Sequence, residues 1–458
     1  MAQKRIGPSL FVISCPVPMP TGLVLISSLQ LFLQNFFLCA ILTYVTSYVT
    51  SGTFPLLRRL RYCCCCCRRR KHRRKIILDT DIGDDIDDAL AVLLLVILHA
   101  IGVVEVVAII TSGQGNHQLR SKLVHTLACA VLGNNDGDGT CSLPIIAGRT
   151  KGTSKGHYMT HGGNNMHKKE SFPVLDEKKK AWLLRTIANE YDSGHQITYL
   201  CIGLLDNLKY IQPPPSSISL CLMGGCFGMF FDGHQAPAAF PEYNVVHSID
   251  SWQWAVRTFS NNLIVPLDVA GVCRFREWPL RLQSCPVAYR QMYEMWYHSP
   301  QLQGSRILEG TKNGTLSSIQ FDACALYLCL YPEAADIKTM RVEVTSTGET
   351  RESTCIDKHQ GHVVRVALSW KDQSGFNKWV LWLLTIVTQR EATAKTAARF
   401  STLFVIFVIF IKEVVEVFIE LGTGSVSDFF GGILGAVIVH CLLDDWRLRK
   451  RCSKNKNE

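Results

Sequence analysis

The feature that most constrains this chain is an acidic stretch directly after a short apolar run. Ile76-Ile-Leu78 is followed by six aspartates between Asp79 and Asp88, and then by the apolar, helix-like segment Ala89–Leu98. Like charges this close repel unless a cation neutralises them or some of them bind protons. Carboxylates and carbonyls without nearby His or Cys favour calcium or magnesium over zinc. A solvated loop capping the helix is the alternative, although capping uses only one or two acids.

The basic charge of the chain is concentrated in one segment. The 458 residues carry a formal net charge of +10, but ten Lys and Arg and no acid lie from Arg58 to Lys75. Removing these ten from the 48 basic residues leaves 38, which equals the 38 acidic residues. A basic surface for nucleic acid is therefore not expected on the rest of the chain.

Cysteine usage favours a reducing compartment. Of 19 cysteines, five form the run Cys63–Cys67, and the others are scattered without a Cys-x-x-Cys pair. This pattern is typical of free thiols and not of a disulfide framework or a structural zinc site.

The N-terminal segment, residues 1–74, predicts contact with a membrane. No charged residue lies between Ile6 and Leu57, and the apolar stretch 22–45 reaches the length of a bilayer span, so we expect a signal anchor. The basic residues of the Cys/Arg-rich run after it would lie on the anionic cytoplasmic face of the membrane, and its thiols would be acylated. The catalytic domain would then lie in the cytoplasm. A disordered low-complexity tail and an incorrect gene-model start are the alternatives for this run.

Residues 75–392 are predicted to form the catalytic domain, and 393–458 an apolar and amphipathic extension with a basic tail. The apolar runs Phe400–Ile411 and Phe429–Leu443 are each shorter than a full bilayer span. A re-entrant hairpin, a kinked span, an interfacial pair and a transmembrane helix all stay open for them.

Strand-like and helix-like segments alternate between Lys75 and about Arg390, which predicts a doubly wound α/β fold with a mostly parallel central sheet. A crossover helix is expected at Ala89–Ile101. Ligands of such sheets bind beyond the carboxyl ends of the strands, where the polar loops of this chain fall. The expected strands are 75–78, 103–111, 197–202, 219–223, 340–348 and 363–370.

The acidic stretch resembles the signature of the inosine-uridine-preferring nucleoside hydrolase family, Asp-x-Asp-Pro-Gly-x-Asp-Asp-Ala. Here it appears as Asp79-Thr-Asp81-Ile-Gly83 followed by Asp87-Asp88-Ala89, with Ile82 in place of proline and Asp84-Asp85 as a two-residue insertion. Five further blocks match in the family's order: Thr111 with Gly115-Asn116, Gly203 with Asp206-Asn207, Met223-Gly224-Gly225 with Pro241-Glu242-Tyr243-Asn244, Leu267-Asp268-Val269, and Phe321-Asp322-Ala323.

The resemblance implies calcium-dependent hydrolysis of the N-glycosidic bond of ribonucleosides. Asp87 would be the base that takes a proton from metal-bound water, and Asp79 a supporting group. The implied ligands of Ca²⁺ are Asp81, Asp88, Asp322 and the main-chain carbonyl of Asp206.

The resemblance also implies a substrate site. Asn116, Glu242 and Asn244 would bind ribose hydroxyls. His161 lies where the family has a mobile His-Gly loop and is a candidate catalytic residue. Phe321 stands where purine-cleaving relatives carry a His that protonates the departing base. A phenylalanine cannot do this, although its ring can stack on the base.

Two other classes of function stay open. A phosphatase of the haloacid-dehalogenase type also begins with Asp-x-Asp after a strand, although Gly83 stands where that pattern has Thr or Val. A membrane-anchored nucleoside-binding protein that has lost turnover is compatible with Phe321. The expected partners are a ribonucleoside and a membrane surface but not nucleic acid, and homo-oligomerisation stays open.

Overall fold

The central sheet is built around β1 (Arg74–Thr80), whose alternate side chains enter two separate cores. Ile76 and Leu78 pack in one apolar cluster and Ile77 in the other, because successive residues of a strand point to opposite faces. Both faces of β1 are therefore covered, which explains why the run is continuously apolar. The structure, a computed structural model, describes residues 73–133, 142–149, 171–236, 240–299, 316–353 and 363–388.

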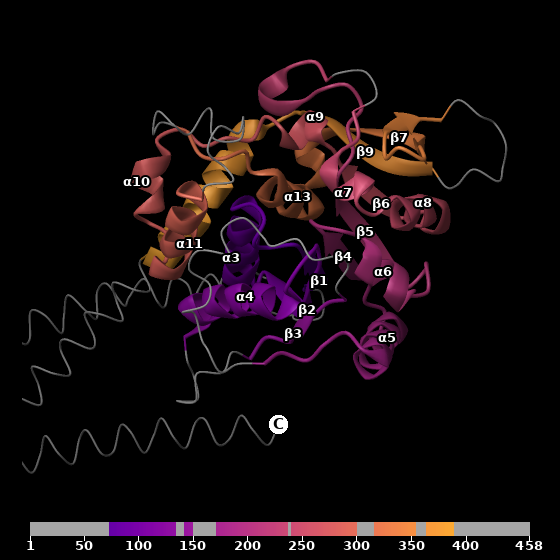
Figure 1. Ribbon diagram of the computed structural model, residues 1–458, viewed down its shortest axis with the longest axis horizontal. Coiled ribbons are helices and arrows are strands. Elements are labelled where there is room, and N and C mark those ends of the chain that lie inside the picture. Colours follow the sequence, from indigo (N-terminus) through magenta and orange to yellow (C-terminus); the bar gives the residue numbers. More distant parts are fainter. Residues whose placement is uncertain are drawn as a thin grey trace, which may run out of the picture. The chain divides into compact units, whose positions relative to one another are not determined.

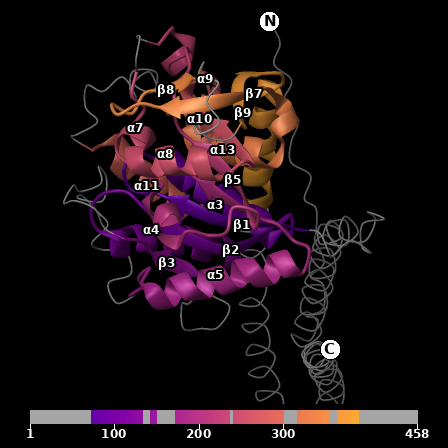
Figure 2. The ribbon, with the colours of Figure 1, turned by 90° about the vertical axis from the view of Figure 1, so that its right-hand side faces the viewer.

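In the described ranges, nine strands form one sheet in the order β3-β2-β1-β4-β5-β6-β9-β7-β8. The strands from β3 to β9 in this order are parallel, and β7 pairs antiparallel with β9 and β8. Figure 2 shows β3 near one end of the sheet and β7 and β8 near the other. The predicted α/β fold with a mostly parallel sheet is confirmed. The remaining strands are β2 (Val104–Thr111), β3 (Ile145–Ala147), β4 (Ile197–Cys201), β5 (Ile218–Met223), β6 (Asn262–Val265), β7 (Ala335–Val344), β8 (Thr350–Glu352) and β9 (Val363–Trp370).

Helices cover both faces of the sheet (Figure 1). One core lies between the sheet and a layer formed by α3 (Asp87–Ala100), α4 (His117–Leu132), α11 (Val287–Tyr297), α13 (Phe321–Leu330) and the helix 373–388. The opposite core lies against α5 (Glu177–Asp192), α6 (Asp206–Ile211) and α8 (Ile249–Thr258). The shorter elements are η3 (Phe231–Gly233), α7 (Tyr243–Val246), α9 (Leu267–Ala270), α10 (Trp278–Leu282) and η5 (Pro332–Ala334).

β1 ends later and α3 begins earlier than predicted, so several aspartates expected in the loop lie in these two elements. β1 continues two residues beyond the predicted strand, so that Asp79 and Thr80 lie within the sheet and are fully buried. α3 begins at Asp87 and not at Ala89, because Asp87 and Asp88 form its first turn. Negative charge is favourable there, next to unpaired main-chain N–H groups.

The segment predicted as a strand at 340–348 belongs to β7, which begins earlier, at Ala335, and ends at Val344. No helix within the described ranges is long and apolar enough to cross a membrane. The segments to which membrane contact was predicted, up to residue 72 and from 393 to 458, lie outside the described residues.

Candidate functional site

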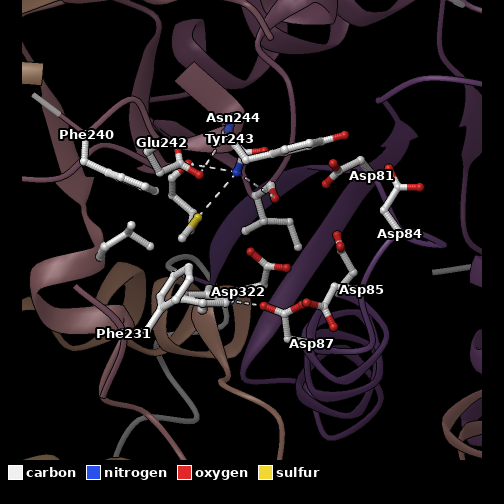
Figure 3. Close-up of a pocket in the computed structure, with 15 residues that line it drawn as sticks. Asp81, Asp84, Asp85, Asp87, Phe231, Phe240, Glu242, Tyr243, Asn244 and Asp322 are labelled. Atoms are coloured by element: carbon white, nitrogen blue, oxygen red, sulfur yellow. Dashed lines mark hydrogen bonds between the residues drawn. The ribbon is translucent and has the colours of Figure 1, made fainter. Parts of the chain in front are cut away.

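A cavity of about 250 Å³ lies beyond the carboxyl ends of β1 and β4. The sheet grows outward from β1 to β3 on one side and from β4 to β6 on the other, so the connections diverge at these two strands. Open α/β sheets bind ligands in the crevice at this point. Figure 3 shows the cavity, which is lined by Asp81, Asp84, Asp85, Asp87, Asp88, Ile202, Met223, Phe231, Phe240, Glu242, Tyr243, Asn244, Leu267, Phe321 and Asp322.

Three buried carboxylates meet at one side of this cavity. Asp87 and Asp88 come from the first turn of α3, and Asp322 from the first turn of α13. One carboxylate oxygen of each lies within 4.8 Å of the others. The main-chain N–H of Asp322 donates to Oδ2 of Asp87 at 3.3 Å, which ties the two helix starts together. We call Asp87, Asp88 and Asp322 the aspartate triad.

The electrostatics of the aspartate triad favour a bound cation. Burial raises the pKa of Asp87 to about 6. Burial, followed by the negative charges of neighbouring aspartates, raises the pKa of Asp88 and Asp322 well above its usual range. Among the described lining residues there is no His, Cys, Lys or Arg. An all-oxygen set of this kind fits a hard divalent cation such as calcium, which would remove the repulsion.

Asp81 lies in the cavity wall but outside the aspartate triad. Burial and the charge of Asp84 raise the pKa of Asp81 to about 8. A Cβ at Gly203 would lie 2.6 Å from Oδ1 of Asp81, so only glycine at position 203 leaves room for this carboxylate. The structure therefore groups Asp87, and not Asp81, with Asp88 and Asp322.

Asp79 and Thr80 support the site from within β1. Tyr199 donates its hydroxyl to Oδ2 of Asp79 at 2.6 Å, and Asn207 donates to Oδ1 at 3.1 Å. Burial raises the pKa of Asp79 to about 7, and this residue is not among the described residues that line the cavity. The Thr80 hydroxyl donates to Oδ1 of Asp88 at 2.5 Å and so fixes a member of the triad.

Besides Asp79, three predicted residues are not among the described residues that line the cavity. Asp206 begins α6, and its carboxylate accepts from the Ser251 hydroxyl at 2.7 Å; a role for its main-chain carbonyl stays a prediction. Asn116 is exposed and caps α4 by accepting from the main-chain N–H of Leu119 at 3.1 Å. His161 lies outside the described residues.

Glu242 and Asn244 form the wall opposite the triad. Glu242 caps α7, and its carboxylate accepts from the main-chain N–H groups of Gly225, Asn244 and Val245 at 3.0–3.2 Å. The Asn244 amide donates to the carbonyls of Ile202 and Met223 at 3.4 and 3.3 Å. Both side chains are buried and held in place, and the Glu242 oxygens keep lone pairs for further donors.

An aromatic wall of Phe231, Phe240 and Phe321 closes the remaining side. The rings of Phe231 and Phe321 lie 5.6 Å apart, and Phe230 stacks on Phe231 at 4.0 Å and meets Phe240 edge-on at 4.6 Å. Sequence reasoning identified Phe321 but missed Phe231, Phe240 and Tyr243. The run Phe-Gly-Met-Phe-Phe after the Met-Gly-Gly block was the available signal, since a cluster of phenylalanines in a loop is unusual.

The model of the inosine-uridine preferring nucleoside hydrolase family matches residues 76–378. The chain belongs to this family.

Solved structures with the same fold include a purine-preferring ribonucleoside hydrolase from Gardnerella vaginalis, with 14% identity and a TM-score of 0.53 over 69% of this chain and 99% of that one. A plant nucleoside hydrolase also has 14% identity and a TM-score of 0.53, over 69% of this chain and 99% of that one. An inosine-guanosine nucleoside hydrolase has 17% identity and a TM-score of 0.50, over 68% of this chain and 99% of that one. No curated protein matches the chain.

The buried carboxyls predict an unusual pH dependence of stability in the metal-free protein. The pKa values of Asp87, Asp79 and Asp81 are raised to about 6, 7 and 8. The folded state therefore binds more protons than the unfolded chain between about pH 4 and 8, and the free energy of unfolding falls as the pH rises. With a chelator, we expect the Tm at pH 5.5 to exceed the Tm at pH 8 by at least about 3 °C.

Calcium should raise the Tm at pH 8 and flatten this dependence, because it takes the place of the protons. Differential scanning calorimetry with calcium and with a chelator measures both effects. A metal-free Tm that rises with pH over this interval would contradict the electrostatic description.

Proposed function

We propose that this protein hydrolyses the N-glycosidic bond of ribonucleosides to ribose and free base in a calcium-dependent reaction, carried out by the domain of residues 75–392. The single observation that supports this best is one cavity that is lined by the aspartate triad, by Glu242 and Asn244 on the opposite wall, and by the aromatic wall on a third side. The family assignment supports the same reaction and gives no support to a haloacid-dehalogenase-type phosphatase.

Asp88 and Asp322 hold the metal in this proposal, with Asp81 and the main-chain carbonyl of Asp206 as the further ligands implied by the sequence. When bound, calcium acidifies water and so supplies a nucleophile near neutral pH. Asp87 takes the proton from the attacking water. Burial raises the pKa of Asp87 to about 6 in the metal-free site, and a bound calcium ion would lower it, so Asp87 would be ionised at pH 7 and able to accept a proton.

Glu242 and Asn244 hold the ribose. The Glu242 carboxylate accepts from sugar hydroxyls, and its three main-chain donors fix its direction before the substrate binds. Cleavage passes through a transition state with positive charge on the sugar ring. The carboxylates around the cavity stabilise that charge, which makes the acidic wall favourable for the reaction and not only for the metal.

The aromatic wall receives the base. Phe231, Phe240 and Phe321 offer apolar surface on which a planar base can stack, but no proton for the departing nitrogen. The second candidate function, nucleoside binding without turnover, is favoured by this same feature, because Phe321 stands where family members that cleave purines carry His.

Substitution of two adjacent aspartates separates metal binding from chemistry. Asp88→Asn should abolish calcium binding and activity, because an amide is a poorer ligand and leaves the other acids unbalanced. Asp87→Asn should keep calcium binding within about tenfold but lower kcat by about 100- to 10,000-fold, as loss of a general base does. Calcium calorimetry and ribose release measure the two effects. Loss of calcium binding in Asp87→Asn would instead make Asp87 a metal ligand, and parental activity in both variants would contradict the proposed function.

A second prediction concerns protonation of the base. Phe321→His introduces a titratable group beside Asp322 and should increase inosine hydrolysis, because general-acid assistance is worth about 100- to 10,000-fold when a base leaves poorly. A nitrophenyl riboside needs no such assistance and should be unaffected. Phe240→His, on the same wall but not next to Asp322, is the matched control.

His161→Ala tests whether the parent already has an acid. If His161 serves as that acid, this variant lowers inosine hydrolysis and spares the nitrophenyl riboside. If neither Phe321→His nor His161→Ala changes the rate ratio among inosine, uridine and the nitrophenyl riboside, the argument from leaving-group protonation is wrong.

A further inference from the structure

A fully buried arginine lies behind the acidic loop. Arg120, in the first turns of α4, has no exposed side-chain surface. Its guanidinium donates to the main-chain carbonyls of Asp81 and Ile82, the latter at 2.9 Å, and to the carbonyl of Gln114 at 2.6 Å. It also donates to both carboxylate oxygens of Asp84, at 2.9 and 2.8 Å. One side chain therefore connects the segment after β1 with the segment after β2.

The surrounding chain is shaped to admit this guanidinium. Gly113 has a φ of +89°, and a Cβ at this position would lie 2.7 Å from Cβ of Asp81 and 3.2 Å from Nη2 of Arg120. Any other residue at position 113 would therefore displace Asp81 or Arg120. A Cβ at Gly203 would likewise lie too close to Asp81, at 2.6 Å from Oδ1 and 2.8 Å from the main-chain nitrogen. These contacts fix the position of Asp81 without a bound metal.

The inserted residue Asp84 supplies the counter-charge for Arg120. Figure 3 shows the Asp84 carboxylate on the same side of the cavity as Asp81, and away from Asp87 and Asp322. Both oxygens of the Asp84 carboxylate accept hydrogen bonds from the Arg120 guanidinium, and Asp84 is not part of the aspartate triad. The insertion therefore adds a carboxylate that pairs with the buried Arg120 side chain.

We propose that Arg120 is a positioning residue for the calcium site: through its bonds to the carbonyls of Asp81 and Ile82 it holds the acidic loop in its metal-binding conformation before the metal arrives. Its five donors in a planar fork reach several acceptors at once, whereas a lysine offers a single nitrogen. A merely charge-balancing cation would need no carbonyl contacts. The proposal rests on the proposed function only in taking calcium as the metal, and metal affinity tests it without reference to hydrolysis.

The test is calcium titration calorimetry on the full-length chain and three variants. Arg120→Met should weaken calcium binding by about 10- to 100-fold, the usual cost of losing a group that orients metal ligands. Arg120→Lys keeps the charge but not the fork, and should bind calcium more weakly than the parent. The double variant Arg120→Met/Asp84→Asn restores the parent's net charge without restoring the carbonyl contacts, and should stay as weak as Arg120→Met.

Two results would overturn the proposal. Parental calcium affinity in the double variant would mean that Arg120 only balances charge, and parental affinity in Arg120→Lys would mean that the fork is not needed. Arg120→Lys also keeps the test decisive if Arg120→Met does not fold. The control is Arg351→Met/Glu343→Gln, which removes an exposed pair between β7 and β8 and should leave calcium affinity unchanged.

Failure of this proposal is distinguishable from failure of the proposed function. If the parent protein binds calcium but releases no ribose, the hydrolase assignment is contradicted. The calcium affinities of the variants still test the role of Arg120 in that case. Variants at position 120 that bind calcium like the parent contradict the positioning role and leave the hydrolase assignment intact.

Discussion

Repulsion among buried carboxylates determines how the acidic site of this protein is built. Buried charge is unfavourable unless it is paired or hydrogen-bonded. Asp79 accepts hydrogen bonds from Tyr199 and Asn207, and Asp88 accepts one from Thr80. Asp84 forms an ion pair with Arg120. No described Lys, Arg or His lines the cavity where Asp87, Asp88 and Asp322 meet. A proton or a divalent cation must therefore balance this group, and the family assignment favours the cation.

The α/β architecture explains how residues from distant segments reach one cavity. The carboxyl ends of parallel strands meet at one edge of the sheet, and β1 and β4 are neighbours although the chain between them contains two other strands. The first turns of α3 and α13 bring the aspartate triad to this edge, and α7 brings Glu242 and Asn244. Acidic, polar and aromatic surfaces thus surround one space.

Much of this arrangement could be predicted from the sequence, because it depends on local patterns. The apolar run before Asp79 predicts β1, and the order of motif blocks predicts that Asp88, Asp322, Glu242 and Asn244 converge. Side-chain direction at the ends of elements was harder to predict, because tertiary contacts decide it. Asn116 caps α4 instead of lining the cavity, and Asp81 is kept out of the triad. Arg120 has no sequence signal, since its partners are mostly main-chain carbonyls.

Product analysis with the full-length chain would show whether the protein hydrolyses nucleosides. Inosine and uridine are incubated with the protein in the presence of calcium or of a chelator, and free base and reducing sugar are quantified separately. We expect equimolar base and ribose from at least one of the two nucleosides with calcium, and neither product with the chelator. Calcium binding at the triad without release of either product would contradict hydrolysis and support a nucleoside-binding protein.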